Sequence, residues 1–296
     1  AVHHDDLATV KALLAAGADA RATNRYGVPP LALACINGNE AIVRALLATG
    51  DDPNTTLRGG ETALMTAART GRVGPVKALL ERGAKVDAAD RKGQTALMWA
   101  AADGHADVVN ALADAGAELS RRLDAGFTAF LFAARNGRLE VGRTLLKRGV
   151  SPDEAIETTR VGGGRMPANR TRALILAVEN GHFELAMELV KAGADPNDQR
   201  GGFTALHVVT WVRKPNRGDD DDGQPPPDGS GNLTSLDFVR QLVAAGADVN
   251  ARLKRGTSGT GRLSLNGATP FLLASKTADL PLMKLLVELG ADPKLP

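Results

Sequence analysis

The stretch GQTALMWAAADGHADVVNALADAGA, residues 93–117, contains one complete copy of the unit from which the chain is built. It opens with Thr95, whose hydroxyl is suited to cap the free backbone donors of a short apolar helix. Gly104 then allows a left-handed turn, and apolar residues recur at helical spacing in a second segment that ends at Gly116. The pattern therefore predicts two short helices separated by a tight turn.

The same unit recurs along the chain. A glycine that closes an apolar run is found at intervals of 33 residues four times and then at intervals of 44, 53 and 44: Gly17, Gly50, Gly83, Gly116, Gly149, Gly193, Gly246 and Gly290. A second series mostly lies 21 residues before these glycines: Pro29, Thr62, Thr95, Thr128, Arg172 and Thr269, with Thr204 as a further member. A fixed period of this length indicates a repeat array. Because such short helices cannot bury an apolar face alone, we expect neighbouring units to stack and share one core.

The composition suits thin helical packing. Of the 296 residues, 43% are apolar but only 3% are aromatic, so the core must consist largely of Ala, Leu and Val. The net charge of +2 gives no argument for nucleic acid. No apolar run reaches the length of about 18 residues that a membrane span needs, and no signal-peptide pattern opens the sequence. The single cysteine, Cys35, excludes an internal disulfide framework and a thiolate metal cluster but leaves the compartment open.

Several segments resemble the Thr-Pro-Leu-His-x-Ala signature of ankyrin repeats. These are GETALMTAA at 60–68, GQTALMWAA at 93–101 and GFTALH at 202–207, and the closing strings GADPN at 193–197 and GADVN at 246–250 match the same family. The resemblance covers nearly the whole chain. It implies an all-α ankyrin solenoid, in which antiparallel helix pairs stack and hairpin "fingers" project at right angles. In this family the inner helices and fingers form the groove that usually binds partners.

On this basis the chain 1–296 is a single ankyrin array with one partial and seven full units. The expected boundaries are approximately 1–23 (partial), 24–56, 57–89, 90–122, 123–155, 156–199, 200–252 and 253–296. Terminal repeats normally present a polar outer face, whereas Leu285, Leu286 and Leu289 have the pattern of interior positions. We therefore expect the natural protein to continue in both directions. Its composition, rich in Ala, Arg and Gly, resembles that of bacterial ankyrin proteins.

Two insertions of 11 residues fall in fingers, one in unit 156–199 and one in unit 253–296. Both are rich in Gly, Arg and Thr, and backbone donors beside arginine can hold a phosphate or carboxylate. Arg165 and Arg262 are therefore candidate anion-binding residues. The competing interpretation is a longer hairpin with solvated arginines, since neither loop leads from a strand into a helix as phosphate motifs do.

A third insertion separates the two helices of unit 200–252, at about residues 213–231. Its four consecutive aspartates raise a calcium hypothesis, but the alternating ligands and final glutamate of a calcium loop are missing. A solvated acidic loop with a proline stretch is the favoured interpretation. Because helix–helix turns lie opposite the fingers, we expect a lateral feature rather than part of the groove. Thr234 begins a capping box that restarts the second helix.

No catalytic or metal-binding arrangement stands out. His105 and His182 occupy the turn of their units and His207 the histidine position of the signature, so all three are assigned structural roles. Cys35 aligns with a buried small residue. With these accounted for, no nucleophilic triad or dyad remains. We expect no enzyme activity, no cofactor and no metal.

The finger tips carry a basic series. Arg25, Arg58 and Arg91 are 33 residues apart and share one register. Since adjacent packed helices lie about 8–10 Å apart, stacked fingers would present a cation at roughly that interval. An acidic protein surface or an extended acidic peptide would suit such an edge. The alternative is ordinary surface charge, and nucleic acid is disfavoured because stacking aromatics are scarce.

We predict partner contacts at tip and groove residues of the types that most often dominate binding energy. These residues are Tyr26, Arg58, Arg91, Phe127, Phe203 and Trp211. Trp99 is predicted to be packed rather than a contact. The favoured function is a non-enzymatic protein-binding scaffold that uses the groove and fingers. The alternatives are a structural subunit integrated permanently in a larger assembly and a non-catalytic fragment of a longer enzyme.

Overall fold

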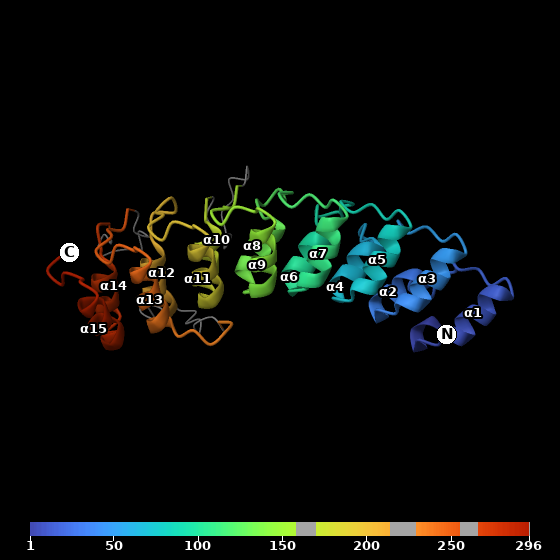
Figure 1. The fold of residues 1–296 in the computed structure, drawn as a ribbon, viewed down its shortest axis with the longest axis horizontal. Coiled ribbons are helices and arrows are strands. Elements are labelled where there is room, and N and C mark those ends of the chain that lie inside the picture. The colour runs from blue at the N-terminus through green and yellow to red at the C-terminus, as the bar shows by residue number, and fades with distance from the viewer. Residues whose placement is uncertain (158–169, 214–228, 255–265, 296) are drawn as a thin grey trace. The chain divides into compact units, whose positions relative to one another are not determined.

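The computed structural model describes residues 1–157, 170–213, 229–254 and 266–295. Within these ranges the chain is helical, as its sequence predicts, and contains no strand beyond two isolated β-bridges. The helices are η1 (Val2–His4), α1 (Leu7–Ala15), α2 (Pro30–Asn37), α3 (Glu40–Ala48), α4 (Ala63–Arg69), α5 (Val73–Glu81), α6 (Ala96–Asp103), α7 (Ala106–Asp114), α8 (Ala129–Arg135), α9 (Leu139–Lys147), α10 (Ala173–Glu179), α11 (Phe183–Lys191), α12 (Ala205–Arg213), α13 (Ser235–Ala244), α14 (Pro270–Lys276) and α15 (Leu280–Glu288) (Figure 1).

Contacts between residues divide the chain into two compact units. Unit 1 consists of residues 1–124 and 128–132, and unit 2 of residues 125–127 and 133–296. In unit 1 the first helices α2, α4 and α6 pack in order, and so do the second helices α1, α3, α5 and α7. Unit 2 repeats the arrangement with α10, α12 and α14 and with α9, α11, α13 and α15. The stacking that the repeat pattern predicts is therefore confirmed within each unit.

The first helices begin as the threonine series predicts. The side-chain oxygen accepts a hydrogen bond from the backbone N–H three residues later, at 3.2 Å for Thr62, 3.4 Å for Thr95 and 3.3 Å for Thr269. Such caps satisfy donors that a helix end leaves free. Gly104 ends α6 with φ 93°, a backbone conformation that is strained for a residue with a Cβ. Thr95 and Gly104 thus specify where α6 begins and where the turn after it lies.

The core combines alanines and large apolar residues on the first helices with valines and leucines on the second. The fully buried set includes Ala67, Ala68, Ala100, Ala101, Leu46, Leu79 and Leu112. Alanine lets helix backbones approach closely, and this explains how so few aromatic residues can fill the interior. Cys35 is buried at an equivalent small position, as predicted.

Asparagines near the finger bases link consecutive repeats. Asn54 Nδ2 donates to the Gly83 carbonyl at 3.2 Å, and Asn54 Oδ1 accepts from the Lys85 N–H at 2.8 Å. Asn197 and Asn250 make the same pair of bonds to the repeat that follows each of them. One amide side chain therefore satisfies a donor and an acceptor at the end of the next second helix.

The histidines tie repeats together, as the sequence predicts. The Nε2 atoms of His105 and His182 lie 2.9 and 3.0 Å from the carbonyl at the end of the preceding first helix. His207 is fully buried, and its Nε2 lies 3.1 Å from the Ala268 carbonyl of the next repeat. These three side chains are engaged in holding the stack.

Candidate functional site

The finger tips of unit 1 are shaped by side chains that fold the backbone back on itself. Asn24 Oδ1 accepts from the N–H groups two and four residues later, at 2.9 and 3.0 Å. Asp90 Oδ1 does the same at 2.8 and 2.9 Å. Turns of this kind place the residue after the asparagine or aspartate at the tip. Arg25 and Arg91 occupy that position.

The tip arginines of unit 1 are exposed and lack acidic partners. Among the described residues the guanidinium groups of Arg58 and Arg91 make no hydrogen bond or ion pair, and that of Arg25 lies 4.8 Å from the ring centroid of Tyr26. Tyr26 is 66% exposed. The Arg91 N–H donates to the Gly59 carbonyl at 3.0 Å, so two consecutive tips touch. The structure therefore brings two uncompensated cations to neighbouring tips.

Arginines on the second helices behave differently. Arg44 contacts Glu40 on its own helix at 2.7 Å and Glu81 on the next second helix at 2.6 Å. Hydrogen bonds to Glu81 and then to Glu40 raise the pKa of Arg44, and the same contact lowers the pKa of Glu81. In unit 2, Arg143 makes a similar bridge to Glu188 at 3.2 Å. The tip arginines thus differ from the arginines of these second helices, which are paired.

The inner helices of unit 1 bring Arg69 and Trp99 together. The Arg69 guanidinium lies 5.6 Å from the Trp99 ring centroid and 3.9 Å from Glu61. Trp99 is partly buried, and its Nε1 is buried without a hydrogen-bond acceptor among the described residues. The packing of Trp99 agrees with its prediction as a packed residue. Its ring also has the Arg69 guanidinium over one face.

Phe127 is not available to a partner, contrary to our prediction. It is 4% exposed and lies in the apolar core of the chain. The Arg135 guanidinium covers its ring at 5.8 Å from the centroid. We predicted that an aromatic residue next to an exposed finger would itself be exposed. Phe127 instead turns inward, and burial of its ring among apolar residues is favourable. We therefore remove Phe127 from the candidate contacts.

Phe203 and Trp211 form an aromatic pair in unit 2. Their ring centroids are 5.2 Å apart with an interplanar angle of 77°, an edge-to-face arrangement. Both rings are partly buried and pack against Leu253, Ala268 and Leu273 of the following repeat. The packing holds the rings in place while leaving part of each accessible. The structure thus joins two of the predicted contact residues.

Glu179, at the end of α10, is a further unusual group on the inner helices. Burial alone raises the pKa of its carboxyl to about 7. Within the described part of the chain it has no hydrogen bond or ion pair. Its position next to an apolar run indicated the end of a helix but gave no sign of this burial.

Arg172 takes the place that threonine holds in other repeats, and its buried side chain makes two ion pairs. Its side chain is 6% exposed, pairs with Asp153 and lies 2.9 Å from Asp198 Oδ2. Arg172 Nη1 also donates to the Asp153 carbonyl at 3.1 Å. The two aspartates flank consecutive fingers, so the arginine fastens one repeat to the next. Its departure from the threonine series was visible in the sequence, but its partners were not.

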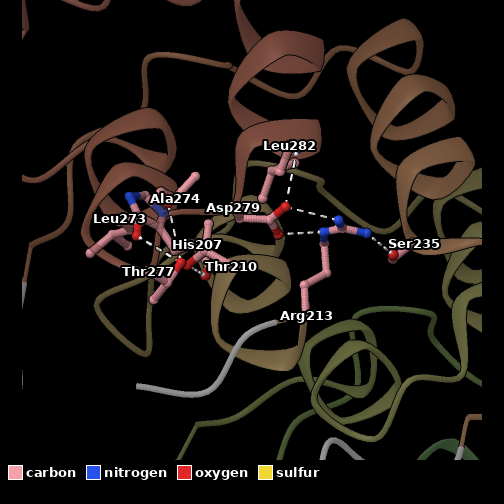
Figure 2. Close-up of polar contacts among 9 residues, drawn as sticks. All are labelled: His207, Thr210, Arg213, Ser235, Leu273, Ala274, Thr277, Asp279 and Leu282. Carbon is pink, nitrogen blue, oxygen red and sulfur yellow. Dashed lines mark hydrogen bonds and ion pairs between the residues drawn. The ribbon is translucent and has the colours of Figure 1, made fainter. Parts of the chain in front are cut away.

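A second buried pair joins the last two repeats. Arg213 Nε lies 2.8 Å from Asp279 Oδ2, and Arg213 Nη2 lies 3.0 Å from Asp279 Oδ1 (Figure 2). A third bond runs from Arg213 Nη1 to Ser235 Oγ at 2.5 Å. Arg213 thereby connects the end of α12, the start of α13 and the start of α15. Neither side chain was singled out from the sequence. Asp279 occupies the turn position that holds histidine in two other repeats, at residues 105 and 182, and gave no sign of its partner.

The remaining predicted sites lie outside the described residues. These are the anion candidates Arg165 and Arg262 and the four-aspartate run of the insertion. In the parts that the structure describes, no group of histidine, cysteine, aspartate or glutamate side chains is arranged to hold a metal. The helices in those parts are too short or too polar to cross a membrane.

Comparison with known proteins agrees with this architecture. A family model described as "Ankyrin repeats (3 copies)" matches residues 1–90 and 76–156, and a single "Ankyrin repeat" model matches residues 172–200. No curated protein matches the chain. Such repeats are generally non-enzymatic scaffolds for protein–protein interaction.

Solved structures resemble the chain along most of its length. The human ASB11 ankyrin repeat domain is 21% identical, with a TM-score of 0.66, covering 90% of this chain and 100% of that domain. The ankyrin repeat domain of Bcl-3, described as a unique member of the IkappaB protein family, is 27% identical, with a TM-score of 0.62, covering 88% and 99%. With its capped helix pairs, linking histidines and matched repeats, the chain belongs to the ankyrin-repeat family.

Proposed function

We propose that this protein is a scaffold that holds another protein through its fingers and inner helices, with the finger tips of unit 1 contacting acidic residues. The observation that carries the proposal is the uncompensated charge at Arg58 and Arg91. The arginines of α3, α9 and α13 pair with glutamates of the same chain, as Arg44 does with Glu81. An exposed cation without an internal partner is free to pair with a carboxylate from outside.

The spacing of the tips suggests the form of the partner. Neighbouring packed helices are about 8–10 Å apart, and an extended chain rises about 3.3 Å per residue. An extended segment with an acidic residue at about every third position would therefore match the register of Arg25, Arg58 and Arg91. Tyr26, held under Arg25, adds a rigid aromatic surface at the same edge.

In unit 2 the proposed contact is the Phe203–Trp211 pair. Aromatic side chains that are already ordered lose little conformational entropy when a partner covers them. Tryptophan is also among the residues most often responsible for binding energy. We place an apolar anchor of the partner here, independently of the acidic contact in unit 1.

The test uses Tyr26 as a crosslinking position. A photoreactive phenylalanine analogue replaces Tyr26, and partners are captured from native cell extract and identified by mass spectrometry. The same experiment is repeated with Arg58→Glu/Arg91→Glu and with Lys11→Glu/Lys77→Glu, a matched control that reverses two exposed cations on second helices. We expect a recurrent crosslinked protein that is lost only in the arginine variant. Equal crosslinking by both variants would contradict the acidic contact.

A structural subunit of a larger assembly is the second candidate. It is favoured by two exposed apolar side chains on α15, Leu280 at 62% and Val287 at 48%. This function predicts that the isolated chain associates as its concentration rises. Sedimentation velocity distinguishes the two functions, because a scaffold with a separate partner stays monomeric over the same range.

A further inference from the structure

A short segment in unit 2 crosses the turns of two preceding repeats. We call residues 229–232, which precede α13, the strap. Ser230 Oγ donates to the Gly137 carbonyl at 3.3 Å, and the Asn232 N–H donates to Glu184 Oε1 at 2.6 Å. Gly229 lies so close to the Gly181 carbonyl that a Cβ would not fit. The strap is therefore docked by backbone contacts and by specific hydrogen bonds.

His182 lies at the centre of these contacts. Its Nε2 is 3.0 Å from the Arg135 carbonyl, while its Nδ1 is 3.2 Å from the Ser230 nitrogen and 2.9 Å from Ser230 Oγ. A backbone N–H can only donate, so Nδ1 must accept and Nε2 must carry the proton that faces Arg135. The docked strap thus requires a neutral imidazole in one tautomer.

We propose that the strap is a pH-sensitive latch that is released when His182 becomes protonated. Protonation places a hydrogen on Nδ1, opposite the Ser230 N–H, so that two donors face each other. The serine hydroxyl can rotate and accept, but the amide cannot. The Ser230 N–H then loses its acceptor in a half-buried contact and faces another donor, which weakens the docked position of the strap.

The surroundings of His182 favour its neutral form. Burial lowers its pKa, and the positive charge of Arg138 acts in the same direction, although the bond to the Arg135 carbonyl opposes them. The Arg135 guanidinium lies over Phe127. Glu179, at the end of α10, and Glu184, whose carboxylate accepts from the strap itself, are the charged residues within three positions of His182 in the sequence. Glu140, Arg143 and Lys147 lie further along α9, and Glu188 and Lys191 lie further along α11.

The sign of the pH effect follows from this. The pKa of His182 is expected to be lower when the strap is docked than when it is released. Docking is then complete above the ordinary histidine pKa of about 6.5 and weakens as the pH falls below that value. Burial raises the pKa of Glu179 to about 7, so the His182→Gln variant is needed to separate the effect of the histidine from that of this carboxyl.

His105 in unit 1 offers an internal comparison. It occupies the same turn position, and its Nε2 lies 2.9 Å from the Arg69 carbonyl. No strap crosses it, and in the described chain its Nδ1 has no hydrogen-bond partner. Its protonation therefore breaks no contact of this kind, and His105→Gln is a control that leaves the latch intact.

The experiment measures amide hydrogen exchange of the whole chain by NMR at pH 7.5 and pH 5.0, corrected for intrinsic exchange rates. We expect protection of the Ser230 amide to fall by about tenfold for each unit separating the docked and released pKa values of His182. Amides in the middle of α11 are expected to keep their protection, which shows that the repeat stays folded. Unchanged protection of Ser230 would overturn the proposal.

Three variants complete the test. His182→Gln should make Ser230 protection independent of pH, while His105→Gln should leave the wild-type dependence. Ser230→Pro removes the N–H and should raise the pKa of His182 toward its ordinary value, measured by ring-proton titration. The titration keeps the proposal testable if His182→Gln disturbs the turn. A His182 pKa that is the same in wild type and Ser230→Pro would refute the latch.

Discussion

Removing the carboxylate of Asp279 tests the buried pair between the last two repeats. The side chains of Arg213 and Asp279 are 16% and 1% exposed, and two bonds of 2.8 and 3.0 Å join them (Figure 2). Breaking a buried pair by removing one partner costs about 3–5 kcal/mol, because the other charge remains desolvated. Asp279 Oδ1 also accepts from the Leu282 N–H at 3.3 Å and so caps α15, a contribution of about 1 kcal/mol.

We therefore expect Asp279→Ala to lower the free energy of unfolding of unit 2 by about 4 kcal/mol, less what the remaining Ser235 contact recovers. Asp279→Asn keeps an oxygen for the cap and should cost less. Combining Asp279→Ala with Arg213→Leu leaves no buried cation, so the double variant should be more stable than the sum of the single effects by about 2 kcal/mol.

The assay is urea unfolding followed by tryptophan fluorescence in a Trp99→Phe background, where Trp211 reports on unit 2. Local reporting matters because repeats can unfold separately. Arg240 and Glu288 form an exposed pair at 3.4 Å that also joins α13 to α15, so Glu288→Ala is the matched control, with an expected cost below about 1 kcal/mol. Equal effects of Asp279→Ala and Glu288→Ala, or additive single effects, would refute the reasoning.

Three further predictions concern separate groups. Asn197→Ala removes two hydrogen bonds to the next repeat and should destabilise unit 2 by about 1–3 kcal/mol in urea unfolding; no change would show that water replaces the amide. Because burial raises the pKa of Glu179 to about 7, its ionisation opposes folding as pH rises from about 4.5 to 7, so Glu179→Gln should stabilise the chain by about 1–3 kcal/mol at pH 8 and hardly at pH 5. Equal effects at both pH values would contradict this. Burial raises the pKa of the Cys35 thiol to about 12, so it should react with a thiol reagent only when the chain unfolds, and rapid labelling in the native state would be the opposing result.

The parts of the fold that were predictable depend on local signals. Thr95 and Thr269 cap their helices because the hydroxyl of a residue at the N-cap lies within reach of the free N–H three residues later. His207 was assigned a linking role from its place in a repeated pattern, and its bond to Ala268 follows from the regular stacking. Both kinds of contact recur from one repeat to the next, so they can be predicted from the period of the sequence.

The contacts that escaped prediction arise where repeats differ. Phe127 and Phe203 both precede a capping threonine, yet only Phe127 is buried to 4% exposure; the difference depends on neighbours that the repeat pattern does not specify. Arg172 pairs with Asp153 and Asp198 across two fingers. Likewise, the return of the strap to His182 joins residues 48 positions apart through an irregular segment. Pairings of this kind depend on three-dimensional proximity alone.

The central claim, that the basic finger tips of unit 1 bind an acidic partner, is tested most directly by affinity. Once the partner crosslinked at position 26 is identified, its dissociation constant is measured for the wild-type chain, for Arg58→Glu/Arg91→Glu and for Lys11→Glu/Lys77→Glu. Placing two carboxylates in the contact should weaken binding at least about tenfold, or 1.4 kcal/mol, while the lysine control should bind as the wild type does. Equal affinity of the arginine variant and the wild type would contradict the account.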